Sequence, residues 1–358
     1  MKNPSNSSQE NISSFIKDNK KAIIVSFIAI AALTFIIIFL SGIDDIFNAL
    51  ARTNLWILGL TFIIEIVIIL LWSLRWKYIL NRMGSFPDFQ NILGILLTSQ
   101  FGKNITPGSV GGEPLRAYLL TNYDGTDIEV SLASTFVSRV FEMLPFIILS
   151  LISIFSLFFW EIDFYLKLFF IFLIILMIIA FIFIIYIGIN KEKSEVMIVK
   201  ILNIISPIVK RIFKEKFVYD NIKDQLIDYA NNFSESFRII VEDKKFFATG
   251  ASLALVAWVL DLFNTYLAFL AIGVHVPIPP FIIIFTISIV ISFIPILPGS
   301  LGITEIIMIV LFASIGISAY NVFAASTLER LSSYIFPTLL GIATSFYYTK
   351  FGFRNKKN

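Results

Sequence analysis

Two matching sets of residues in this chain of 358 could carry chemistry. The first is the motif TPGSVGGE (residues 106–113) followed by Arg139, and the second is LPGSLGITE (297–305) followed by Arg330. The spacing from the motif proline to the arginine is equal in both, because 139 − 107 = 32 and 330 − 298 = 32. Guanidinium groups bind carboxylate and phosphate in a forked geometry, and exposed backbone N–H groups also bind phosphate. The pattern predicts an internal duplication, offset by 191 residues (298 − 107), with an anion-binding part in each half.

The residue types around each motif indicate two roles. Recognition of an anion needs positive charge and free backbone donors. We expect it at Lys103, Ser109, Arg116, Arg139, Ser300 and Arg330. Gating or ion coupling needs helix breakers and carboxylates that can take up a proton or cation. We expect it at Pro107, Gly108, Gly111, Glu113, Glu142, Pro298, Gly299, Gly302, Glu305 and Glu329.

The two arginines also have a structural explanation, which the sequence leaves open. Arg139 could pair locally with Glu142, and Arg330 with the neighbouring Glu329 or with an acid on another helix. A charge at membrane depth is costly, so it usually pairs or lines a polar path. Matched placement in both halves favours the functional explanation, because two unrelated structural pairs would have no reason to share a spacing.

The carboxylates have the same two explanations. Glu113 and Glu305 follow a helix break, where a carboxylate satisfies the free N–H groups and the dipole of a new helix without any substrate. The alternative is coupling to a proton or cation. Glu65 and Asp261, inside apolar segments, leave the same choice open.

Composition places the chain in a bilayer. Hydrophobic residues make up 57% and charged residues 15%, with a mean hydropathy of +0.86, whereas soluble domains carry about 25% charge. Cysteine is absent, which excludes disulfides and thiolate chemistry, and the one histidine, His275, cannot build both a triad and a metal site. No nucleophile–base pair is visible, so we expect no enzyme, no catalytic residue, no metal and no cofactor.

Apolar runs of about 20 residues predict helices that cross the membrane. Six are found, at about 22–42, 54–74, 130–159, 164–188, 246–273 and 320–349. Two further apolar segments, 89–121 and 280–317, are each broken centrally by one of the motifs. We expect each to be a re-entrant helical hairpin that enters and leaves on one side, with two short tilted crossings as the alternative.

Lysine and arginine predict the orientation, because they gather on the cytoplasmic side. Almost all of those outside the spans lie in 1–21, 75–88, 190–245 and 350–358, and the opposite connections hold only Arg52. Both termini are therefore expected in the cytoplasm, in a multi-pass protein of the cell membrane.

This topology makes the two halves inverted copies. Repeat one covers about 54–159 and repeat two about 246–349, with 164–188 as the odd span that inverts them. Secondary transporters share this design. We expect an all-α polytopic membrane protein with six full spans and two re-entrant hairpins, in a single transmembrane domain over 22–350.

Three polar segments complete the chain. Residues 1–21 are expected to be disordered and 351–358 to form a basic cytoplasmic tail. Residues 190–245 are partly periodic, which predicts amphipathic helices on the inner membrane surface, with a solvated linker as the alternative.

Three stretches resemble a known family: PGSVGGEPLR (107–116), SRVFE (138–142) and LPGSLGITE (297–305). They look like the lysylphosphatidylglycerol synthase transmembrane, or flippase-like, family over about 22–350. That family includes the membrane part of the bacterial multiple peptide resistance factor, which moves aminoacylated phosphatidylglycerol between leaflets. Nothing follows residue 358 in this sequence, so we expect the soluble aminoacyl-transferase domain to be missing, and the resemblance does not imply synthase activity.

The leading hypothesis is a lipid flippase that moves an anionic or phosphate-bearing headgroup between leaflets. One alternative is a secondary transporter of a small soluble anion, which would need a water-filled route to both sides. Another is a non-transporting membrane partner of a lipid-modifying enzyme. Nucleic acid is not an expected partner.

Overall fold

The computed structural model describes residues 42–106, 112–160, 162–190, 243–292 and 301–351, together with the single positions 196 and 200. This part of the chain is helical and contains no β-strand. The segment 1–21, the predicted span 22–42, most of 190–245 and nearly all of the tail 351–358 lie outside it.

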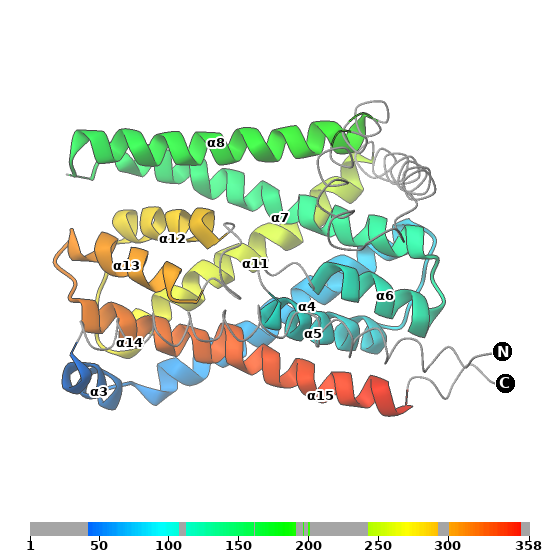
Figure 1. The fold of residues 1–358 in the computed structure, drawn as a ribbon, viewed down its shortest axis with the longest axis horizontal. Helices are drawn as coiled ribbons and strands as arrows, with labels where there is room; N and C mark the ends of the chain where they lie inside the picture. Colours follow the sequence, from blue (N-terminus) through cyan, green and yellow to red (C-terminus); the bar gives the residue numbers. More distant parts are fainter. Residues whose placement is uncertain are drawn as a thin grey trace, which may run out of the picture.

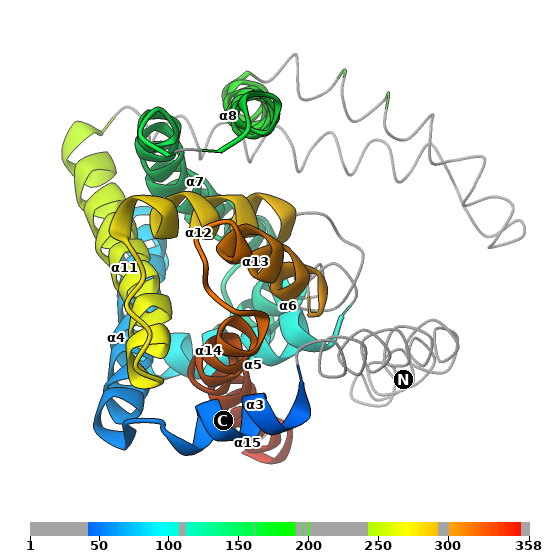
Figure 2. The same cartoon turned by 90° about the vertical axis from the view of Figure 1, so that its left-hand side faces the viewer.

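Four helices in the described part are long and apolar enough to cross a membrane. They coincide with four of the six predicted spans. They are α4 (Leu55–Arg82), α7 (Ile128–Leu157), α8 (Phe164–Ile189) and α11 (Lys244–Ala271). The end-on view shows α8 beside α7 at the edge of the bundle (Figure 2).

The prediction that α4 ends near residue 74 was wrong. The helix starts after Asn54, whose side chain accepts hydrogen bonds from two backbone N–H groups, and continues to Arg82. From Leu60 onward no proline or glycine interrupts the helix until Gly84, which has a φ of 82°. Arg75, assigned to a cytoplasmic loop from sequence, is therefore part of the helix and is buried.

The predicted span 320–349 is one helical run with a wider turn inside it. α14 (Ala319–Arg330) passes into the π-helical turn η3 (Leu331–Ile335) and then into α15 (Phe336–Phe351). Pro337 has no N–H to donate to the carbonyl four residues earlier, so a regular α-helix is interrupted at this point. π turns are often found at functional sites, and this one directly follows Arg330.

Both motif-containing segments are broken helices, as the sequence predicts. The first is α5 (Phe89–Ile105) and α6 (Gly112–Asp124), and the second is α12 (Ile278–Ser292) and α13 (Ile303–Ala313). Each is shorter than the roughly 20 residues that a crossing helix needs. Figure 1 shows the two pairs toward opposite ends of the molecule: α5 and α6 lie where α15 ends, and α12 and α13 lie toward α3.

Each broken helix packs against the last long helix of the other half. α5 packs on α15, where the Thr98 and Thr344 hydroxyl oxygens are 3.0 Å apart. α12 packs on α7, where the Ser153 hydroxyl donates to the Thr286 hydroxyl across 2.7 Å. Ser153 and Thr344 are related by the predicted offset, because 344 − 153 = 191, whereas their partners Thr98 and Thr286 are not, because 286 − 98 = 188. The two halves thus contact each other through α5 with α15 and through α12 with α7, and α4 packs against α11.

One helix was not predicted. The connection 43–53 contains α3 (Ile43–Ala51), which buries Ile46 and Ala49 and packs against α14. With 9 residues, this amphipathic helix is shorter than the roughly 20 apolar residues by which a membrane span is recognised. It covers the end of the molecule at which α12 and α13 lie (Figure 1).

Candidate functional site

The first half builds a partly buried ion-pair cluster between α4, α6 and α7. Arg139 on α7 donates to Glu142 one turn later, with 2.8 Å between Nη1 and Oε2, and also pairs with Glu113 on α6. Arg75 on α4 pairs with the other oxygen of Glu142 and donates to Ser138 across 3.2 Å. The local pair expected from sequence exists, but it is one link in a cluster that ties three helices together.

Arg116 lies on the inner side of this cluster. Its guanidinium carbon is 3.8 Å from the centre of the Trp76 ring, which is a cation–π contact. Its nearest carboxylate, Glu113, is 4.0 Å away, at the limit of an ion pair. The arginine is therefore held mainly by stacking on α4, and its charge is only weakly paired.

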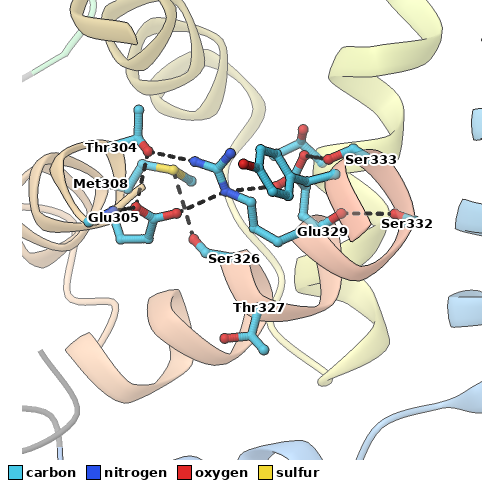
Figure 3. A network of polar contacts seen from close by, with 12 residues as sticks. Thr304, Glu305, Met308, Ser326, Thr327, Glu329, Ser332 and Ser333 are labelled. Carbon is cyan, nitrogen blue, oxygen red and sulfur yellow. Dashed lines mark hydrogen bonds and ion pairs between the residues drawn. The ribbon is translucent and has the colours of Figure 1, made fainter. Parts of the chain in front are cut away.

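The second half builds a smaller cluster around Arg330. Its Nε lies 2.9 Å from Glu305 on α13, and its Nη2 donates to the Thr304 hydroxyl across 2.8 Å. Figure 3 shows Thr304, Glu305 and Met308 on one side of the guanidinium, and Glu329 and Ser333 on the other. Glu329 is 3.9 Å from Arg330, so the acid on another helix is the closer partner.

Glu305 has both of the roles that the sequence left open. One carboxylate oxygen binds Arg330, and the other accepts a hydrogen bond of 2.7 Å from the backbone N–H of Gly302, at the start of α13. Gly302 has a φ of 86°, a conformation that favours glycine. Helix capping and the ion pair therefore depend on the same carboxylate.

The two arginines are equivalent, but their acids are not. Under the offset of 191, Glu142 corresponds to Ser333 (142 + 191 = 333), and Ser138 corresponds to Glu329 (138 + 191 = 329). Each half thus has one acid and one serine beside the arginine, in exchanged positions. Ser333 donates to Glu329, and Ser138 accepts from Arg75. Both clusters therefore combine an arginine with an acid and a serine, but the acid and the serine stand at different positions relative to the arginine.

A cavity of about 550 Å³, here called the central cavity, joins the two clusters. Its charged lining comes from α4, α5, α7, α11 and α14, and therefore from both halves. The residues are Glu65, Lys103, Arg139, Glu142, Asp261, Glu329 and Arg330. Charged groups enclosed among the apolar helices of a membrane protein are typical of a substrate or ion path.

Two smaller cavities adjoin the central one. The α6 cavity, about 50 Å³, shares Arg139 and Glu142 with it, and the α13 cavity, about 160 Å³, shares Glu329 and Arg330. Each arginine–carboxylate pair thus stands in the wall between two cavities.

The structure brings together the predicted residues that it describes. Lys103, Arg139, Glu142, Glu329 and Arg330 surround the central cavity. Arg116 and Glu113 line the α6 cavity, and Glu305 lines the α13 cavity, with Gly302 at the start of α13. The predicted motif residues outside the described part are Pro107, Gly108, Ser109, Gly111, Pro298, Gly299 and Ser300.

Arg75 is the site residue that sequence analysis missed. A signal was present, because the run from Leu55 to Arg82 has no internal proline and Arg75 lies seven residues after the buried Ile68, on the same helical face. Among the described residues, no group of three or more His, Asp and Glu side chains could hold a metal ion.

Comparison with known proteins agrees with the composition and the fold. Residues 23–341 match the family described as the lysylphosphatidylglycerol synthase TM region. A UPF0104 membrane protein of Methanothermobacter thermautotrophicus is 40% identical over 342 residues, covering 96% of this chain and 97% of the relative. UPF0104 membrane proteins of Methanocaldococcus jannaschii and Pyrococcus horikoshii are 29% and 24% identical, covering 91% and 86% of this chain and 94% and 92% of those relatives. The chain is a multi-pass membrane protein that belongs to the lysylphosphatidylglycerol synthase transmembrane-region family.

Proposed function

We propose that this protein moves the polar headgroup of an anionic or phosphate-bearing lipid between leaflets, while the acyl chains stay in the bilayer. The observation that carries the proposal is the central cavity, lined by charged side chains from both halves and bounded on two sides by an arginine–carboxylate pair. Arg139, Arg330 and Lys103 supply the positive charge for a phosphate oxygen.

The proposal includes an inverted-repeat architecture with re-entrant hairpins. α5–α6 would open to the cytoplasm and α12–α13 to the other side of the cell membrane, with both termini cytoplasmic. The placement of the two pairs toward opposite ends of the molecule supports this, as do the matched contacts of Ser153 and Thr344 (Figure 1). The distribution of lysine and arginine between the connecting segments supports the cytoplasmic placement of both termini. Arg75 does not contribute to that distribution, because it lies within α4.

The ion pairs are the proposed gates. Arg139 holds α6 to α7 through Glu113, and Arg330 holds α13 to α14 through Glu305. A phosphate that takes the place of a carboxylate on one arginine releases that hairpin, while the pair at the other end stays closed. Alternating replacement of this kind would carry the headgroup past one gate at a time.

Reconstitution tests the proposal. Purified protein in liposomes that contain NBD-labelled phosphatidylglycerol would be assayed by dithionite quenching, which reports the label that reaches the outer leaflet. Arg139→Gln and Arg330→Gln are each expected to slow translocation about tenfold or more, since each removes a charge-assisted hydrogen bond.

Arg82→Gln is the matched control, because Arg82 lies at the end of α4, with its side chain 44% exposed, and pairs with Asp243 across 3.0 Å. It should translocate at the wild-type rate. Equal rates for all three variants, with correctly folded protein, would refute the arginine mechanism.

The same geometry supports a second candidate, a transporter of a small soluble anion. The three cavities adjoin in series and share their charged walls, as a route for a soluble ion would require. Saturable uptake of an anion into protein-containing vesicles, with no movement of labelled lipid, would favour it over lipid translocation.

A further inference from the structure

The α6 cavity is lined by more cationic than anionic side chains, whereas the central cavity is not. Its cations are Arg75, Lys103, Arg116 and Arg139, and its carboxylates are Glu113 and Glu142. Four cations against two acids leave this small space attractive to an anion.

Two of these arginines have donors without a hydrogen-bond partner in the part of the chain that the structure describes. Arg75 is 1% exposed and Arg116 is 6% exposed. Nε and Nη1 of Arg75, and Nε and Nη2 of Arg116, have no hydrogen-bond partner among the described residues. A buried N–H donor without an acceptor is costly, so these four nitrogen atoms point to a ligand that accepts hydrogen bonds from them.

Both guanidinium groups are also held in place. Arg75 is anchored through Nη2 by Ser138 and Glu142, and Arg116 is anchored over the Trp76 ring. The donors are thus fixed before a ligand arrives, which lowers the entropic cost of binding.

The first turn of α6 adds backbone donors to the same space. α6 begins at Gly112, which lines the cavity and lies against α5. A Cβ at this position would lie 2.8 Å from the Lys103 Cβ and 3.0 Å from the Ser99 carbonyl oxygen. Glycine therefore lets the start of the helix approach Lys103, where the helix dipole favours negative charge.

We propose that the α6 cavity is an oxyanion site for one phosphoryl group, bound by Arg75, Arg116 and the first turn of α6. The site lies on the α6 side of Arg139 and differs from the arginine pairs that bound the central cavity. Its volume of about 50 Å³ suits a single phosphoryl group rather than a whole headgroup. The inference deepens the proposed function and rests on it only for the source of the phosphate, which would be a lipid.

Binding of inorganic phosphate tests the site without any transport assay. Thermal unfolding of the full chain in detergent would be followed while phosphate is titrated against chloride at equal ionic strength. Wild-type protein should show a saturable rise in Tm. Arg116→Gln should raise the apparent Kd about tenfold or more, and Arg116→Lys, which keeps the charge but loses the fork, should lie between.

Arg116 is the primary variant because its loss does not break an ion pair of Arg75. Arg82→Gln again serves as the control, and it should bind phosphate as the wild type does. The inference is overturned by a wild-type protein that shows no saturable phosphate effect, or by equal phosphate affinities of Arg116→Gln and Arg82→Gln.

A second ligand distinguishes a lipid headgroup from free phosphate as the source of the phosphoryl group. Dioctanoyl phosphatidic acid should compete with inorganic phosphate, and dioctanoyl glycerol should not. Competition by the lipid supports a headgroup site. Binding of inorganic phosphate alone overturns the lipid source and assigns the site to a soluble anion.

The site and the proposed function can fail separately. Phosphate binding without lipid movement in liposomes would reject the proposed function and keep the site. Lipid movement without phosphate binding would reject the site alone.

Discussion

Arg330 on α14 and Glu305 on α13 form an ion pair, with 2.9 Å between Nε and Oε1, in the wall that separates the central cavity from the α13 cavity. The same carboxylate accepts the backbone N–H of Gly302. One side chain therefore links α13 to α14 and also caps the start of α13. If this pair is the proposed gate, breaking it should loosen this helix end as well.

The first prediction concerns Glu305. Glu305→Gln should lower the free energy of unfolding by about 2 kcal/mol, because a largely buried arginine loses its charged partner. Glu305→Ala should lower it further, because Gly302 also loses its acceptor. Asp88→Asn is the control, since Asp88 precedes α5 and makes no side-chain cap. Thermal unfolding in detergent measures the differences, and a Glu305→Gln protein as stable as Asp88→Asn would contradict the prediction.

The second prediction concerns the interlocked halves. The chain has no cysteine, so Thr98→Cys with Thr344→Cys introduces one pair, and Ser153→Cys with Thr286→Cys another. The native hydroxyl oxygens are 3.0 Å and 2.7 Å apart, so both pairs should form a disulfide on mild oxidation.

Protease cleavage between the halves followed by a non-reducing gel would report the cross-link. The mismatched pair Thr98→Cys with Thr286→Cys should stay uncross-linked. Cross-linking of the mismatched pair at the same rate would show that the halves do not interlock as described.

The third prediction concerns the sidedness of the two motifs. Single cysteines at Ser109 and Ser300 would be labelled with a membrane-impermeant thiol reagent in oriented vesicles. Inverted hairpins predict that Ser109→Cys reacts from the cytoplasmic side and Ser300→Cys from the opposite side. Reaction of both from one side would remove the main structural support for the transporter function.

The fourth prediction compares two glycines. Gly112→Ala should lower the free energy of unfolding by about 1–3 kcal/mol, because the new methyl group meets Lys103 and the Ser99 carbonyl. Gly59→Ala, near the start of α4 with nothing within 4 Å, should be neutral or stabilising, because alanine favours the helix. If both variants unfold at the same temperature, α5 and α6 are not packed as closely as the structure shows.

The sequence by itself determined the elements and the places where they break. Long apolar runs form helices in a bilayer because only internal hydrogen bonding satisfies the backbone there, so α4, α7, α8 and α11 could be read directly. Proline and glycine end helices by local effects, so the breaks between α5 and α6 and between α12 and α13 were also predictable. The offset of 191 residues predicts an internal duplication.

Only the tertiary structure decided which side chains meet. Arg75 binds Glu142 from a helix 67 positions earlier in the chain, and Arg330 chooses Glu305 over its neighbour Glu329. These pairing partners depend on how helices far apart in the chain pack together, and the spacing of residues along the sequence does not reveal that packing. The end of α4 was missed for a related reason: the apolar run ends before Arg75, but the helix continues to Arg82, and Arg75 is stabilised in the interior by its pair with Glu142.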